Sequence, residues 1–171
     1  SWYGEKRLCE LLRLLQKKFK MAKDIEVTVE ANPDSVTEKA LRAVRRAGVN
    51  RLSLGMQSAC DQELQDVHRP HTFQQVVEAV HAARKAKIKN LNLDLIYGLP
   101  GQTEESWHNS VEQAIQYGKP GNVIVDLSST APDIILELYQ QAKDAGMFLL
   151  DSPVSGGNPM AIAGTLAIMT G

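Results

Sequence analysis

The chain has 171 residues, of which 43% are hydrophobic and 23% charged, and its formal net charge is −1. This balance excludes a disordered chain, which would combine low hydrophobicity with high net charge. No apolar run approaches the ~18 residues that a membrane-spanning helix needs, so we expect a globular protein that requires no membrane.

Cys9 and Cys60 are the two cysteines of the sequence. They lie far apart and no secretory signal precedes them, so we expect free thiols and a cytoplasmic location. An iron–sulfur cluster usually takes four thiolates, and two cannot hold one.

Positive charge concentrates near the start of the chain. Residues 5–23 carry Lys6, Arg7, Arg13, Lys17, Lys18, Lys20 and Lys23 against Glu5 and Glu10. Leu8, Leu11, Leu12, Leu15 and Phe19 alternate with these charges at helical spacing, which favours an amphipathic helix with a solvated face over a nucleic-acid-binding segment. We therefore expect no nucleic-acid partner.

Strand-like and helix-like segments then alternate along the chain. β-Branched and apolar runs predict strands at residues 25–31, 51–58, 90–98, 122–128 and 147–154. Helical periodicity predicts helices at residues 35–48, 73–87, 103–117 and 132–145. Start signals are Ser35 with Glu38, Thr103 with Ser106, and Pro132, whereas Gly48, Gly118 and Gly146 match left-handed helix caps. A short helix over residues 158–163 and an edge strand over 165–170 complete the prediction.

This order predicts an α/β fold with a mostly parallel sheet of about five strands and right-handed crossovers. A Rossmann-like, doubly wound sheet has helices on both faces and is the arrangement we prefer. The alternative is a partial (βα) barrel, which would leave Leu and Val side chains exposed on an uncovered face and favour dimerisation or closure. We expect residues 1–171 to form a single domain, as a monomer or a homodimer.

Four motifs in order occupy the first two thirds of the chain. Residues 25–33 read IEVTVEANP, residues 51–58 RLSLGMQS, residues 68–71 HRPH and residues 92–103 NLDLIYGLPGQT. Together they resemble radical S-adenosylmethionine proteins of the oxygen-independent coproporphyrinogen oxidase and haem-chaperone branch. The resemblance implies consecutive strand-helix units of a partial barrel, with ligand groups at the carboxyl ends of the strands.

By this resemblance Glu30, Gln57, Arg69 and Asp94 correspond to residues that contact S-adenosylmethionine. Carboxylates and an amide suit a ribose diol and an ammonium group, and an arginine suits a carboxylate. The alternative is that Glu30 and Asp94 cap the following helices while Arg69 pairs on the surface. His68 and His71 do not predict a metal site, because Pro70 interrupts their spacing and no other ligand is near.

The chain departs from this family at its metal cluster. The family's Cys-x-x-x-Cys-x-x-Cys motif and the glycine-rich loop after it do not occur in residues 1–171. Without a [4Fe–4S] cluster no electron donor cleaves the sulfonium, so we expect no radical chemistry from this chain.

The last third of the chain carries a second set of motifs. Residues 123–132 read VIVDLSSTAP and residues 149–157 LLDSPVSGG, which is similar to the Rossmann domain of β-hydroxyacid dehydrogenases. By this resemblance Ser128 and Ser129 lie near the NAD(P) cofactor, and the loop of Ser155, Gly156 and Gly157 contacts substrate. A Ser-Gly-Gly turn also leaves backbone N–H groups open to a carboxylate. The G-x-G-x-x-G fingerprint and the family's catalytic lysine are not in these residues.

The two resemblances meet at the Gly- and Pro-containing loop of residues 116–122. The simplest hypothesis is an engineered chimera of residues 1–118 and 119–171, a scaffold without a complete catalytic site that needs no cofactor and no partner. One alternative is a module that weakly binds S-adenosylmethionine, another nucleotide or a small carboxylate. The other is an oxidoreductase that depends on a partner chain for its missing parts.

Overall fold

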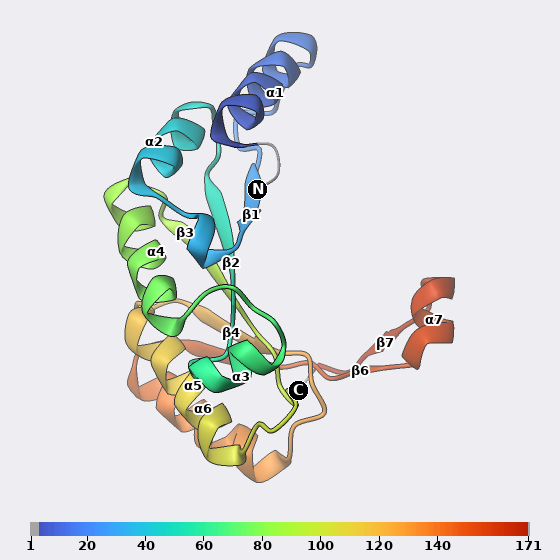
Figure 1. The fold of residues 1–171 in the computed structure, drawn as a ribbon. Helices are drawn as coiled ribbons and strands as arrows, with labels where there is room; N and C mark the ends of the chain where they lie inside the picture. Colours follow the sequence, from blue (N-terminus) through green and yellow to red (C-terminus); the bar gives the residue numbers. More distant parts are fainter. Residues whose placement is uncertain (1–3, 171) are drawn as a thin grey trace. The chain divides into compact units, whose positions relative to one another are not determined.

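The computed structural model describes residues 4–170 of the chain, in which helices and strands alternate (Figure 1). The first part contains α1 (Gly4–Lys18), β1 (Thr28–Ala31), the 3₁₀ turn η1 (Pro33–Ser35), α2 (Glu38–Arg46), β2 (Arg51–Gln57), α3 (Asp61–Asp66), α4 (Phe73–Lys85), β3 (Asn90–Leu95) and α5 (Glu104–Tyr117). The rest contains β4 (Val123–Asp126), α6 (Pro132–Asp144), β5 (Phe148–Asp151), β6 (Val154–Ser155), α7 (Gly157–Ala163) and β7 (Ala167–Ile168). No helix within this described range is long and apolar enough to cross a membrane.

The α/β class is confirmed, but the strands do not form one sheet. In the described residues β1, β2 and β3 make a parallel sheet, β4 and β5 make a second parallel pair, and β6 pairs with β7 in an antiparallel ribbon. The expected sheet of about five strands is therefore wrong. Periodicity in a sequence indicates a strand and its faces, whereas the neighbour of that strand depends on tertiary contacts that the pattern does not contain.

The chain divides into two compact units, Ser1–Ser110 and Val111–Gly171, each described here by itself. The boundary falls inside α5, upstream of the loop at residues 116–122 where the two sequence resemblances meet. The predicted division between residues 118 and 119 concerns where the two fragments come from, not how they fold. That origin and the folding of residues 1–171 as a single domain both stay predictions.

The three-stranded sheet has one apolar face and one polar face. Leu52 and Leu54 of β2 are fully buried, and they form a core with Leu41 and Val44 of α2 and with residues of α1 and α4. The alternate positions carry polar side chains, because successive residues of a strand point to opposite sides. In this unit the helices of the core cover one face only, unlike the doubly wound arrangement, and the other face is polar rather than lined with Leu and Val.

Most helix boundaries agree with the sequence signals. Pro132 occupies the first turn of α6, and Thr103 and Ser106 exchange backbone-to-hydroxyl hydrogen bonds of 3.0 and 3.1 Å at the start of α5. The predicted start at Ser35 is wrong: Ser35 belongs to η1, and the Thr37 hydroxyl caps α2 by accepting from the Ala40 N–H.

The three predicted glycine caps behave differently from one another. Gly48 and Gly146 have φ of +108° and +71°, as a left-handed cap requires. Gly118 is not among the residues with positive φ, so its prediction as a left-handed cap is wrong. Its backbone is tightly approached instead, because an added Cβ would meet the side chain of Met147.

In the second unit α6 packs against β5, and Ile134 and Leu138 of α6 are buried. Val123 and Val125 of β4 lie in register with Phe148 and Leu150 of β5, and all four side chains are exposed. The predicted terminal helix and strand are present as α7 and β7, but β7 pairs with the short strand β6, which the sequence analysis did not predict.

Candidate functional site

Three of the four residues implied by the first resemblance lie on the strands of one sheet. Glu30 is in β1, Gln57 ends β2 and Asp94 is next to last in β3. Glu30 is in register with Ser53, and Asp94 is in register with Gly55 two residues farther along β2. Because the strands are parallel and these positions alternate with the apolar ones, Glu30 and Asp94 belong to the polar face near the carboxyl edge.

Asp94 is held by two neighbours on that face. The Ser53 hydroxyl donates to Oδ2 of Asp94 at 2.9 Å, and Nδ2 of Asn92 donates to Oδ1 at 2.6 Å. Nδ2 of Asn92 also donates to the Ser53 hydroxyl at 3.0 Å, which closes a ring of three side chains. Neither Glu30 nor Asp94 caps a helix. The Thr37 hydroxyl caps α2, and the Thr103 hydroxyl accepts from the Ser106 N–H at the start of α5.

Gln57 has an unusual backbone conformation where β2 ends. Its φ is +65°, the register shifts between Gly55 and Gln57, and the residue is 7% exposed. The Gln57 amide folds back over Gly55, since Nε2 lies 2.7 Å from the point that a Cβ on Gly55 would occupy. A non-glycine residue in the left-handed region costs about 1–3 kcal/mol and is common at functional sites. Glycine at position 55 makes room for this amide on the polar face beside Asp94.

Arg69 lies in the segment after α3, at a half-buried position. Its backbone N–H donates to the Leu64 carbonyl at 2.8 Å, and within residues 4–170 its guanidinium takes part in none of the ion pairs. In that range no hydrogen bond or ion pair joins the Arg69 side chain to Glu30, Gln57 or Asp94. The surface pairing considered as its alternative role is therefore not seen in the described residues.

The loop after β3 is anchored by a buried carboxylate that the sequence analysis missed. Glu63 of α3 is 4% exposed and accepts from Ser58 Oγ at 2.6 Å and from Gln102 Nε2 at 3.2 Å, and the Ser106 hydroxyl contacts its other oxygen. Oε1 of Gln102 in turn accepts from the Gly98 N–H at 2.6 Å. Glu63 therefore joins α3, the loop over residues 96–103 and α5, although no cation pairs with it among the described residues.

The candidate residues of the second unit lie in two places, the loop after β4 and the turn between β6 and α7. The Ser128 N–H donates to Oδ1 of Asp126 at 2.8 Å just after β4, and Ser129 follows it at an exposed position. Ser155 belongs to β6, while Gly156 and Gly157 have φ of +126° and +56° where α7 begins (Figure 1).

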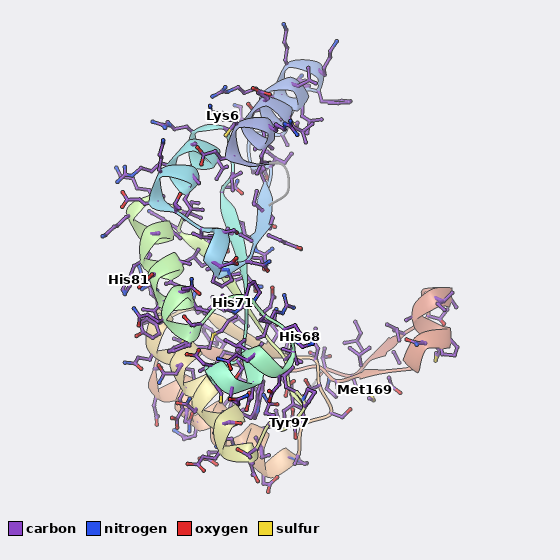
Figure 2. The ribbon with its side chains drawn as sticks, viewed as in Figure 1. Lys6, His68, His71, His81, Tyr97 and Met169 are labelled. Atoms are coloured by element: carbon purple, nitrogen blue, oxygen red, sulfur yellow. The ribbon has the colours of Figure 1, made fainter. Side chains whose placement is uncertain are left out.

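The cysteines and histidines are scattered over several elements. Cys9 is buried in α1, and Cys60 precedes α3. His71 is buried with Nε2 3.3 Å from the Met56 carbonyl, whereas His68, labelled with it in Figure 2, is exposed in the same segment between α3 and α4. Within the described residues no three His, Cys, Asp or Glu side chains could hold a metal ion together. A [4Fe–4S] cluster does not fit the residues present.

Ser53 and Asn92 are the other site residues that the sequence analysis missed. The signal for them is the alternation in Asn92-Leu93-Asp94 and Ser53-Leu54-Gly55, which places each one on the same face as the site. That pattern indicates the face, but the register between β2 and β3 is needed to bring Ser53 to Asn92.

Comparisons with known proteins match both parts of the chain. The family model of the radical SAM superfamily matches residues 3–114, and that of the NAD binding domain of 6-phosphogluconate dehydrogenase matches residues 59–171. The heme chaperone HemW of Mycobacterium tuberculosis is 38% identical over 118 residues, and that of Haemophilus influenzae is 35% identical over 120 residues. These alignments cover 69% and 70% of this chain but 30% and 31% of the relatives, so the chain spans under a third of their length.

A solved structure supports the same relationship. Coproporphyrinogen III oxidase (HemN) from Escherichia coli, described as a radical SAM enzyme, is similar over 67% of this chain and 26% of its own, with a TM-score of 0.62 and 29% identity. The two family matches overlap over residues 59–114. In that overlap α4 and β3 pack with β1 and β2 in the first unit, which agrees with the radical SAM motifs quoted from the sequence.

Proposed function

We propose that this chain is a fusion whose first part binds S-adenosylmethionine. The chain belongs to the radical SAM superfamily through residues 3–114. Through residues 59–171 it belongs to the NAD-binding family of 6-phosphogluconate dehydrogenase. The proposed binding surface is the polar face of β1, β2 and β3 at its carboxyl edge. The chain supplies this binding without radical chemistry or hydride transfer of its own.

The observation that carries the proposal is the set of polar groups on this face. Asp94 is a carboxylate whose two oxygens each accept one hydrogen bond, and the Gln57 amide lies beside it over Gly55. A carboxylate has room for about four hydrogen bonds, so Asp94 keeps acceptor capacity for a ribose diol. Glu30 supplies a second exposed carboxylate, which suits the positive ammonium group of the ligand. Arg69 is unpaired within the described residues and suits the ligand's carboxylate.

The proposal includes no catalysis, because the residues that each reaction needs are not in this sequence. Cleavage of the sulfonium needs an electron from an iron–sulfur cluster, and Cys9 and Cys60 do not form a ligand set for one. Hydride transfer needs a dinucleotide cradle, and the G-x-G-x-x-G fingerprint is not in residues 1–171. Binding is thus the function that the site supports.

We further propose that the fusion is engineered, with its join in the loop over residues 116–122. Parallel strands and helical crossovers occur in both parent folds, so fragments of each can follow one another along one chain. An uninterrupted natural gene that encodes all 171 residues would overturn the engineered origin and leave the binding proposal intact.

Calorimetric titration of the full chain with S-adenosylmethionine tests the binding. We expect saturable heat in the millimolar range or below, and a loss of affinity of roughly tenfold for Asp94→Ala and for Glu30→Ala, as for one charge-assisted hydrogen bond. Glu78→Ala is the matched control, because Glu78 is an exposed carboxylate on α4, whose buried residues pack on the opposite, apolar face. Heat indistinguishable from dilution at millimolar ligand would leave the chain as a scaffold without this ligand.

A further inference from the structure

The ring formed by Ser53, Asn92 and Asp94 uses every donor of its two neutral members. The single hydroxyl hydrogen of Ser53 goes to Oδ2 of Asp94, and the two amide hydrogens of Asn92 go to Oδ1 of Asp94 and to the Ser53 oxygen. Ser53 is 7% exposed and Asn92 is half-buried, whereas Asp94 is exposed. The two neighbours therefore fix the orientation of the carboxylate from its inner side and leave its remaining acceptor sites to solvent.

The register of the sheet explains why Asp94 depends on these two residues. The residue opposite Asp94 on β2 is Gly55, which has no side chain to support it. The space above Gly55 is taken by the Gln57 amide. Support comes instead from the pair two residues earlier on each strand, where Asn92 lies opposite Ser53.

We propose that Ser53 and Asn92 are positioning residues that set the Asp94 carboxylate to accept two hydrogen bonds from a vicinal diol. This inference rests on the proposed binding of S-adenosylmethionine, and it assigns to these residues the preference for a ligand with both ribose hydroxyls. A carboxylate already held in one orientation loses little rotational freedom when the ligand binds. Without the two donors the Asp94 side chain turns freely, and its discrimination between a diol and a dideoxy sugar falls.

The test compares S-adenosylmethionine with its analogue that lacks both ribose hydroxyls, by NMR titration of the full chain. We expect the unmodified chain to prefer the diol by about tenfold or more, as for hydrogen bonds to a charged group. Ser53→Ala and Asn92→Ala each reduce this ratio to about threefold or less without weakening the dideoxy analogue, and Ser53→Thr, which keeps the hydroxyl, retains the ratio. Thr28→Ala is the matched control, because its hydroxyl lies on the same face of β1 but donates to Glu26.

The results distinguish failure of the positioning role from failure of S-adenosylmethionine binding. If Ser53→Ala and Asn92→Ala weaken both ligands equally, or leave the ratio unchanged, the positioning role is overturned while the binding site stands. If the unmodified chain binds neither ligand at millimolar concentration, the proposed function fails and the inference fails with it. Far-UV circular dichroism of each variant confirms that it is folded, and the two alanine variants report on the same carboxylate independently.

Discussion

Replacement of Glu63 by alanine is expected to destabilise the first unit, since the carboxylate of Glu63 organises a buried polar cluster. Ser58 is fully buried and donates to Glu63 at 2.6 Å; without Glu63 its hydroxyl loses this hydrogen bond to a charged group and keeps the longer 3.3 Å contact with Ser110 Oγ, at a cost of about 1.5–3 kcal/mol. One buried methylene, at Cγ, is also lost, worth about 0.8 kcal/mol. Part of this sum is offset, because the alanine variant no longer has to desolvate a carboxylate when it folds. We expect a loss of about 1–3 kcal/mol in the free energy of unfolding.

Urea unfolding followed by tryptophan fluorescence measures this loss. Trp107 is 6% exposed and follows Ser106 directly in α5, so it reports on the region that Glu63 joins. The sequence has two tryptophans, and a Trp2→Phe background leaves Trp107 as the reporter. Asp66→Ala is the matched control, because it removes an exposed carboxylate from the same helix and is expected to change stability by less than about 0.5 kcal/mol.

A double-mutant cycle identifies the hydrogen bonds as the cause. Glu63→Gln keeps the shape of the side chain and replaces one acceptor oxygen by a donor, so an intermediate loss of about 1–2 kcal/mol is expected. Its effect should not add to that of Ser58→Ala, with a coupling of at least about 0.5 kcal/mol. The reasoning is refuted if Glu63→Ala unfolds at the same urea concentration as Asp66→Ala, or if the two changes in the cycle are additive.

Three further changes and one comparison of probes test the rest of the fold. Leu54→Ala empties a fully buried position of β2 and should cost about 2–5 kcal/mol in urea unfolding, whereas a loss below 1 kcal/mol would contradict the assigned core. Thr72→Ala removes the hydroxyl of the capping box that it forms with Gln75 at the start of α4; a loss of about 1 kcal/mol is expected, and Thr72→Ser should retain most of the stability. Gly146→Ala forces a Cβ into the left-handed region at φ +71° and toward the Pro120 side chain, so thermal unfolding should show a loss of at least about 1 kcal/mol, and an unchanged midpoint would rule out this cap geometry. If residues 1–171 unfold as one domain, the transitions followed by Trp107 fluorescence and by far-UV circular dichroism coincide, and two separated transitions would show that the units unfold independently.

Local chemistry explains the part of the fold that could be predicted. The apolar alternation of Leu52 and Leu54 indicates a strand with one buried face, and Pro132 indicates the first turn of α6. The capping threonine of α2 was missed because Ser35 and Thr37 both offer a hydroxyl, and the short turn η1 decides between them. The positive φ predicted for Gly118 is wrong; at this helix end the tip of the Met147 side chain occupies the space that a Cβ would fill, which the local pattern does not reveal.

The candidate site divides in the same way between sequence and structure. The motifs determine that Glu30, Gln57 and Asp94 each lie near the carboxyl end of a strand, because alternation and turn residues are local properties of the chain. Only the tertiary structure decides that Ser53 and Asn92 hold Asp94, and that Gln57 folds back over Gly55. The contacts of Ser53 with Asn92 and Asp94 depend on the register between β2 and β3, which are about 40 residues apart in the chain, and a shift of one residue would turn each polar side chain to the opposite face.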